Sequence, residues 1–415
     1  MMARATLALV LLISCAHALV HVYEISLPSV EQEIASEYFG NDLASGKAFT
    51  GRLSNAWRLM WGLGAVVAGF FVDRFGSRRL LAVYLLGCSV SCALAAISSS
   101  ESFLFVAMIV MGLLASIYHP AGLSLISHET TAENRPQALG IHGIFGSTGI
   151  STAPLFAGIL LSASFTWRQV YWALMLPGVV LGAVFVVQAI RYPAVESLRE
   201  STKSEIDDQD HVDWTSFLTL TCMASVQGFI YSALMSFLPR YLSGSLDGVA
   251  EQLRDVLPGS FAEALDLSTG NFLAAAVLLV GCVGQYLAGR FAKAAILEKQ
   301  LAVIMFGNVP FLLWMGFALT WHRPIAAGLL ALVHFMHQPI YNSLIAKYTP
   351  RHRRSLCYGF SFAMGLGLGS FGALFAGYFQ SDQMVYGSLA GAAGIGGAIC
   401  CVLVALNSQT DRLRK

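Results

Sequence analysis

GFFVDRFGSRR, residues 69–79, separates two apolar runs at about residues 53–72 and 80–98. The stretch contains the pair Asp73-Arg74, the glycine Gly76 and two further basic residues, Arg78 and Arg79. Each flanking run is long enough to cross a bilayer as a helix. The stretch therefore predicts a tight, charged turn between two membrane helices, on one face of the membrane.

The composition of the 415-residue chain places most of it in lipid. Hydrophobic residues make up 56% of the chain and charged residues only 12%, against about 25% charged residues in soluble domains. The net charge of +1 gives no basis for a nucleic-acid partner. The eight cysteines lie almost all within apolar runs and form no C-x-x-C pair, so we expect neither a cysteine metal site nor a disulfide framework.

The first residues imitate a secretory signal, because Arg4 precedes an apolar run that is followed by small residues. The apolar run, however, continues to about Leu27, which is long enough to span a membrane. We therefore expect this segment to be kept as the first helix rather than cleaved.

Apolar segments of about 20 residues predict an all-α membrane protein with twelve transmembrane helices. Their expected ranges are 5–27, 51–72, 79–98, 102–127, 136–163, 168–190, 214–243, 269–292, 298–320, 323–346, 355–380 and 385–406. The only long polar stretch divides them six and six. We therefore expect an N-terminal six-helix bundle in residues 1–190, a cytoplasmic linker in 191–213 and a C-terminal six-helix bundle in 214–415.

The distribution of Lys and Arg predicts the orientation in the membrane. The face of the 69–79 turn holds 18 of the 25 basic residues and the other face six, while Arg58 lies inside the second helix. Basic residues stay on the cytoplasmic side. We therefore expect a multi-pass protein of the cell membrane, plasma or inner, with both termini in the cytoplasm.

The two predicted bundles repeat each other in sequence. A shift of 219 residues aligns the fourth and fifth helices with the tenth and eleventh without a gap. Identical pairs in this register include Pro120 and Pro339, Arg135 and Arg354, Gly140 and Gly359, Gly146 and Gly365, and Gly158 and Gly377. Long outer loops are expected after the first helix of each half, at 28–50 and 244–268.

The turn at 69–79 closely resembles the signature G-x-x-x-D-R-x-G-(R)-R between helices 2 and 3 of the major facilitator superfamily. The departure is Ser77, where an arginine or lysine is common, and an ordinary basic loop is the alternative. The resemblance covers essentially the whole chain. It implies two parallel six-helix halves that bind substrate between them near the midplane, in a monomer. It also implies gating roles at the cytoplasmic rim for Asp73, Arg74, Gly76 and Arg78.

The first helix carries His17, His21 and Glu24, whose spacings of four and three residues place them on one helix face. Ionisable groups in lipid are expensive, so by default they face a cavity and have a function. Imidazoles beside a carboxylate screened from water are suited to taking up and releasing a proton. We predict proton coupling here, with a structural cluster as the alternative. Helix 1, together with Tyr118-His119-Pro120 in helix 4, also weakly resembles the fosmidomycin-resistance exporter branch.

Polar residues in several predicted helices indicate a substrate cavity. They are His119, His142, Arg58, His337, Gln338 and Asn342. For the histidines, hydrogen-bonded interior positions are the alternative. Pro120 and Pro339 each remove a backbone donor and are expected to kink their helices, which lets one end move as a gate. Arg58 is expected to bind an anionic group, to pair with Glu24 or to extend to the interface.

The fifth helix contains Gly140, Gly149, Ala153-Pro154 and Ala157-Gly158, which resemble the antiporter motif of the superfamily, G-x8-G-x3-G-P-x2-G-G. Alanine replaces two of the glycines. Small residues let helices approach closely, and Pro154 is expected to bend the helix and to take part in gating. The motif favours export over import, and a generic packing face is the alternative.

Motifs for other chemistries do not occur in the sequence, which has no P-loop, nucleophile elbow or H-E-x-x-H. We therefore expect no enzyme activity, no cofactor and no metal, and an ion gradient as the energy source. The predicted function is secondary active transport of a small organic molecule by alternating access, as proton-coupled efflux. The alternatives are a proton-coupled importer of a small organic anion and a non-transporting sensor or assembly protein on a transporter fold.

Overall fold

The computed structural model describes residues 3–131, 134–192, 211–246, 259–350 and 354–413 of the chain. Within these ranges the secondary structure is helical, with no strand. We call residues 3–192 the first half and residues 211–413 the second half. The predicted linker lies largely outside the described residues, so the proposed domain limits remain a prediction.

The first half contains eight helices within its described residues. They are α1 (Arg4–Ser29), α2 (Glu31–Phe39), α3 (Leu43–Phe75), α4 (Ser77–Ala96), α5 (Glu101–Ala115), α6 (Tyr118–Glu129), α7 (Arg135–Ser162) and α8 (Trp167–Arg191).

The second half follows a similar plan with more irregular turns. Its elements are α9 (Trp214–Leu242), α11 (Gly259–Phe291), the 3₁₀ turn η1 (Ala294–Ile296), α12 (Leu297–Phe317), α13 (His322–His334), α14 (His337–Tyr348), α15 (Arg354–Phe362), the π-helical turn η3 (Ala363–Gly367), the 3₁₀ turn η4 (Leu368–Ser370), α16 (Phe371–Tyr378) and α17 (Asp382–Leu413).

The predicted class of polytopic all-α membrane protein is confirmed. Among the described residues, 11 helical spans are long and apolar enough to cross a membrane. The remaining predicted segment, 323–346, corresponds to the pair α13 and α14, which is interrupted at Phe335 and Met336. With this pair the twelve predicted segments are all helical, and the ends differ by several residues.

The predicted outer loop at 28–50 is wrong in part, because this stretch is mostly helical. It contains α2 and the first turns of α3, which begins far earlier than the predicted residue 51. The side chain of Asp42 caps α3 by accepting a hydrogen bond from the Ser45 N–H at 3.1 Å. Residues 247–258 of the second predicted loop, 244–268, lie outside the described residues, and α11 begins at Gly259.

The predicted kinks at Pro120 and Pro339 are confirmed as helix breaks. The first break, at Ser116 and Ile117, separates α5 from α6, and the second separates α13 from α14. A proline ring clashes with the carbonyl four residues before it, and that residue is Ser116 for Pro120 and Phe335 for Pro339. Pro154, in contrast, lies inside the uninterrupted helix α7.

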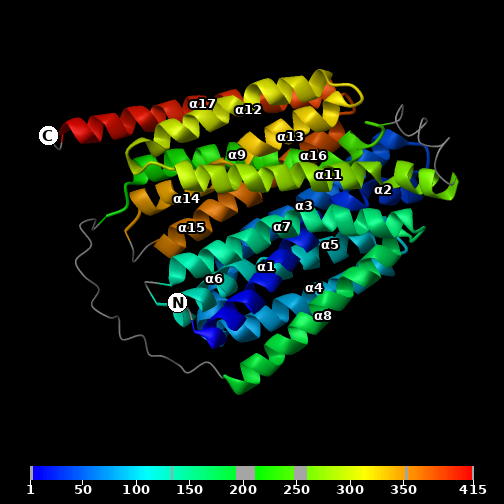
Figure 1. Cartoon of the computed structure of the whole chain (residues 1–415), viewed down its shortest axis with the longest axis horizontal. Helices are drawn as coiled ribbons and strands as arrows, with labels where there is room; N and C mark the ends of the chain where they lie inside the picture. The colour runs from blue at the N-terminus through cyan, green and yellow to red at the C-terminus, as the bar shows by residue number, and fades with distance from the viewer. Residues whose placement is uncertain (1–2, 132–133, 193–210, 247–258, 351–353, 414–415) are drawn as a thin grey trace.

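The helices form two groups that lie side by side along their length (Figure 1). Within the halves, α1 packs on α7, α4 on α8 and α12 on α17, while α7 meets α11 and α3 meets α16 across the halves. We call the end with the chain termini and the 69–79 turn the terminal end, and the end with α2 the distal end (Figure 1).

The distal end holds several hydrogen bonds between the halves. The Lys47 ammonium donates to the Phe379 carbonyl at 2.7 Å, and the Asn271 amide donates to the Ser29 carbonyl at 3.0 Å. Arg240 of α9 forms an ion pair with Glu31 of α2. The two halves are therefore joined at the distal end in this structure.

Candidate functional site

The centre of the site is Glu24, whose side chain is fully buried in α1. One carboxylate oxygen accepts hydrogen bonds from the Arg58 guanidinium of α3 and from the Tyr231 hydroxyl of α9, the latter at 2.9 Å. The other oxygen accepts from His21 Nδ1 at 2.7 Å. Because Tyr231 belongs to the second half, the acid joins both halves near the middle of the molecule.

Arg58 is as deeply buried as its partner. Its side chain is 2% exposed, and its guanidinium lies 5.3 Å from the centre of the Tyr231 ring. A buried charge without a counter-charge is strongly destabilising, so the pair with Glu24 explains how both can occupy the interior. Of the three roles considered for Arg58, the structure gives the pairing with Glu24. Its Nη2 nevertheless has no hydrogen-bond partner among the described residues.

His17 continues the same face of α1 toward the terminal end. Its Nδ1 lies 2.8 Å from the His142 carbonyl oxygen, and its Nε2 lies 3.3 Å from His21 Nε2. The His142 ring stacks on the His17 ring with centroids 3.9 Å apart. A Cβ at Gly146 would overlap the His17 ring, so this glycine of α7 provides the space for the imidazole.

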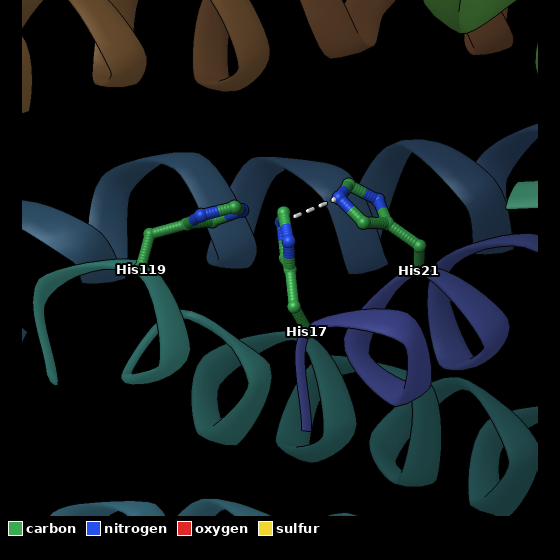
Figure 2. A group of neighbouring side chains, drawn as sticks. All are labelled: His17, His21 and His119. Carbon is green, nitrogen blue, oxygen red and sulfur yellow. Dashed lines mark hydrogen bonds between the residues drawn. The ribbon is translucent and has the colours of Figure 1, made fainter. Parts of the chain in front are cut away.

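His119 completes the group from α6, on the side facing the second half. Its ring centroid is 5.4 Å from that of His17 and 5.8 Å from that of His21. Trp61 of α3 and Phe362 of α15 pack against it, with centroids 5.7 and 5.0 Å away. Figure 2 shows the imidazoles of His17, His21 and His119 converging from two helices. One ligand nitrogen from each ring can be chosen so that all three lie within 4.8 Å of one another, which would permit metal binding.

The second half has a polar group of its own around Gln227. The Gln227 amide nitrogen lies 3.0 Å from both His334 Nε2 and His337 Nδ1. The Tyr231 ring is nearly parallel to the His334 ring at a centroid distance of 6.3 Å. Tyr231 therefore contacts both polar groups, one through its hydroxyl and one through its ring.

The predicted cavity residues separate into three places. Arg58, His119 and His142 lie with the helix 1 residues, and His337 lies in the second polar group. Gln338 accepts a hydrogen bond from the Gln285 amide at 2.8 Å, and the Ser147 hydroxyl of α7 donates to Gln285 at 2.5 Å. Asn342 is exposed on α14, where its backbone carbonyl accepts from the Tyr358 hydroxyl at 2.8 Å.

In the described part of the chain, the ion pair and ring contacts of the 69–79 turn lie within the first half. Gly76 ends α3 with a φ of 87°, a conformation that glycine adopts without strain. Arg78 forms an ion pair with Glu129 at the end of α6 and lies 5.3 Å from the Tyr192 ring centre. Asp73 is exposed and has no hydrogen bond or ion pair in the described part of the chain. Arg74 lies over the Phe75 ring. The gating role of this turn therefore stays a prediction.

Sequence reasoning missed two parts of the site. For Tyr231, nothing local in the sequence indicates that its hydroxyl reaches Glu24. Gln227 was not singled out, because one amide in an apolar helix gives no signal by itself. Both depend on contacts between α9 and distant helices.

Comparison with known proteins agrees with this architecture. The sequence profile of the Major Facilitator Superfamily matches residues 23–374. The puromycin resistance protein pur8 of Streptomyces alboniger is 31% identical over 150 residues, which are 35% of this chain and 27% of that protein. The multidrug efflux pump LfrA of Mycolicibacterium smegmatis is 34% identical over 128 residues, 30% of this chain and 25% of that protein. Each alignment thus spans about a quarter of the relative's own length.

A solved structure extends the likeness of the fold to nearly the whole chain. The inward-open xylose transporter XylE from E. coli superimposes with a TM-score of 0.73 at 11% identity, covering 96% of each chain. At this sequence identity the superposition shows similarity of the fold alone. The efflux pump and the xylose transporter are named as transporters and not as enzymes.

Proposed function

Because the chain belongs to the Major Facilitator Superfamily, we propose that it exports a small organic compound across a membrane in exchange for protons. The observation that carries this proposal is the buried carboxylate of Glu24 at the contact between the halves. Its partners come from α1, α3 and α9, so its charge state acts on both halves at once. The resistance and efflux names of two relatives support export as the direction.

The coupling step follows from the hydrogen bonds of Glu24. Ionised Glu24 holds Arg58, His21 and Tyr231 as donors. Protonation removes the charge that faces Arg58 and weakens the bond from Tyr231. The link between the two halves then weakens. A ligand shifts an equilibrium between two conformations only when it binds them with different affinities. A proton on Glu24 meets this condition, because the joined arrangement favours the ionised form.

The remaining residues receive roles that follow from their positions. His21 and His17 form the path by which a proton reaches or leaves Glu24. His119, His142 and Trp61 line the first-half side of the substrate site. We place the terminal end in the cytoplasm on the basis of its excess of basic residues. In this orientation the joined distal end lies on the outer side, which supports assigning this arrangement to the inward-facing state, and we assign the turn with Asp73 and Arg78 to stabilising the opposite state.

The test is proton flux in proteoliposomes that contain a pH-sensitive dye. Candidate compounds, with puromycin first because of the relative's name, are added on one side. We expect wild type to move protons when a substrate moves the opposite way, and Glu24→Gln to lose this flux. Glu37→Gln is the matched control, because Glu37 lies at the distal end in an exposed ion pair with Arg168. Equal flux in wild type and Glu24→Gln would overturn the proposal.

Import of a small organic anion is the second candidate function. It is favoured by the buried Nη2 of Arg58, which has no partner among the described residues and could bind a carboxylate or phosphate oxygen. The same experiment separates the two, because proton and substrate then move in one direction. Substrate-dependent alkalinisation of the outer medium would support import.

A further inference from the structure

We propose that His17, His21 and His119 bind one divalent transition-metal ion of the zinc class. Three imidazole nitrogens, one from each ring, lie within 4.8 Å of one another. The spacing of His17 Nε2 and His21 Nε2 is 3.3 Å. Two nitrogen ligands at ~2.1 Å from a tetrahedral zinc ion are ~3.4 Å apart. The first two ligands therefore already have the separation that such an ion requires.

The tautomers of His17 and His21 follow from their other hydrogen bonds. His17 Nδ1 faces the His142 carbonyl oxygen at 2.8 Å, and a carbonyl can only accept. His21 Nδ1 faces the Glu24 carboxylate at 2.7 Å. Each Nδ1 therefore carries the proton, which leaves two Nε2 lone pairs facing each other. Two lone pairs at 3.3 Å repel unless a cation, either a proton or a metal ion, lies between them.

These same contacts are the ones that support metal-bound histidines. A histidine ligand commonly donates its second N–H to a carboxylate or a backbone carbonyl, which fixes the ring and raises its basicity. His21 has the carboxylate and His17 has the carbonyl. Both histidines therefore have the supporting hydrogen bond that metal ligands commonly have.

His119 supplies the third ligand. Its Nε2 is buried and has no hydrogen-bond partner within the part of the chain that the structure describes. Such an atom lacks the interaction that buried polar groups ordinarily have, and Figure 2 places its ring opposite His21, with His17 between them. One nitrogen of each of the three rings lies within 4.8 Å of the others, so the three can share one ion. The fourth position stays open to water or a small ligand, as in zinc sites with three protein ligands.

The donor set decides the class of metal. Three neutral imidazoles suit zinc, copper, nickel or iron, whereas magnesium and calcium prefer oxygen ligands. The nearest carboxylate, Glu24, is already occupied by Arg58, Tyr231 and His21. Phe362 of the second half covers His119 at a centroid distance of 5.0 Å. Movement of the halves would therefore control entry of the ion.

The experiment measures metal binding to the purified full chain in detergent, carrying an affinity tag without histidines. Co²⁺ is titrated as the probe, by calorimetry and by the visible absorption of a low-symmetry cobalt site. We expect one ion per chain in wild type, with the absorption of four-coordinate cobalt. His119→Gln should weaken binding at least ~10-fold, since loss even of a supporting contact has an effect of this size. His128→Gln on the same helix is the matched control and should bind as wild type does.

A second variant guards against a failure of folding. His119→Cys keeps a metal ligand at the same position and should restore binding, with a new cobalt–thiolate absorption in the near ultraviolet. Absence of one-to-one binding in wild type, or equal affinity in wild type and His119→Gln, would overturn the site. Binding is measured without transport, so this result does not depend on the proposed efflux. Proton flux is in turn measured with chelator present, so each proposal can fail by itself.

Discussion

Glu24 and Arg58 form an ion pair inside a membrane protein, where each charge depends on the other. The Glu24 side chain is fully buried and the Arg58 side chain is 2% exposed. Removal of one member leaves the other without compensation, whereas removal of both leaves two neutral groups of similar size. The loss of stability on removing one partner is therefore larger than the stability that the pair itself contributes.

A double-mutant cycle at these two positions tests this argument. Glu24→Gln and Arg58→Met should each destabilise the protein by about 3–5 kcal/mol, because each leaves one buried charge unpaired. The double variant should lose less than the two single variants together. Thermal unfolding in detergent, followed for all four proteins, measures the effect. Additive losses would show that the two side chains do not act as a pair.

The local part of the site could be predicted from the sequence and the distant part could not. His17, His21 and Glu24 share one face because helix periodicity is fixed by local spacing. The partner of Glu24 on α9 depends on how two halves pack. Gly146 belongs to the repeat that the sequence reveals, but its actual contribution, space for the His17 ring, appears only when α1 and α7 are in contact.

At the scale of elements, close approach between α3 and the π-helical turn η3 shapes the contact of the halves. A Cβ on Gly62 of α3 would overlap the backbone of Gly367, whereas a Cβ on Gly69 of the same helix would meet nothing within 4 Å. Backbone atoms cannot move aside as a side chain can. Position 62 therefore requires glycine because of the close packing on Gly367, and not because of its own backbone conformation.

This contrast gives a matched pair of substitutions in one helix. Gly62→Ala should lower stability by about 1–3 kcal/mol through overpacking, and it should favour separation of the halves. Gly69→Ala should leave stability unchanged or raise it by about 0.5–1 kcal/mol, since alanine is the better helix former. Unfolding temperatures in detergent compare the two. A similar loss in both would mean that the α3–η3 contact tolerates a methyl group.

Helix breaks divide into those that sequence can predict and those that it cannot. Pro120 and Pro339 act through the missing N–H and the ring, which are local properties, and the breaks lie where the ring meets the carbonyl four residues back. The π turn at 363–367 has no such residue. It lies in a run of glycines that packs on α3 and α9, so its cause is tertiary.

At the scale of the whole molecule, the distal contact depends on acids in α2. Arg240 pairs with Glu31, and Glu33 is close enough to be affected by both charges. Burial raises the pKa of Glu33 to about 7, with a further upward contribution from Glu31. In the unfolded chain a glutamate has a pKa of about 4.3. The folded state therefore binds this proton more tightly than the unfolded state does. The resulting stabilisation of the fold is complete below about pH 4.3 and is lost as the pH rises through 7.

The sign of this effect is testable with two glutamates of the same helix. Between pH 5 and pH 8, wild type should lose about 2–3 kcal/mol more of its free energy of unfolding than Glu33→Gln, because most of the interval between the unfolded and folded pKa values lies in this range. Glu37 should behave in the opposite way, because the hydrogen bonds from Arg168 and Trp167 outweigh burial and lower its pKa. Its contribution is present above about pH 4.3 and is lost only as the pH falls further, so Glu37→Gln should run parallel to wild type between pH 5 and pH 8. Parallel pH profiles for wild type and Glu33→Gln would contradict the assignment.

The irregular turns between α15 and α16 have a consequence for the winding of this span. A π turn underwinds a helix, and the 3₁₀ turn directly after it overwinds the helix. The two deviations largely cancel, because Gly377 still faces Gly51 of α3 as its repeat mate Gly158 faces Asn271 of α11. The helices before and after the irregular turns thus keep the same rotation about the helix axis. Residues 363–370 could therefore convert to regular α-helix with a local change in length. The flanking helices α15 and α16 would keep the faces that they present to their neighbours.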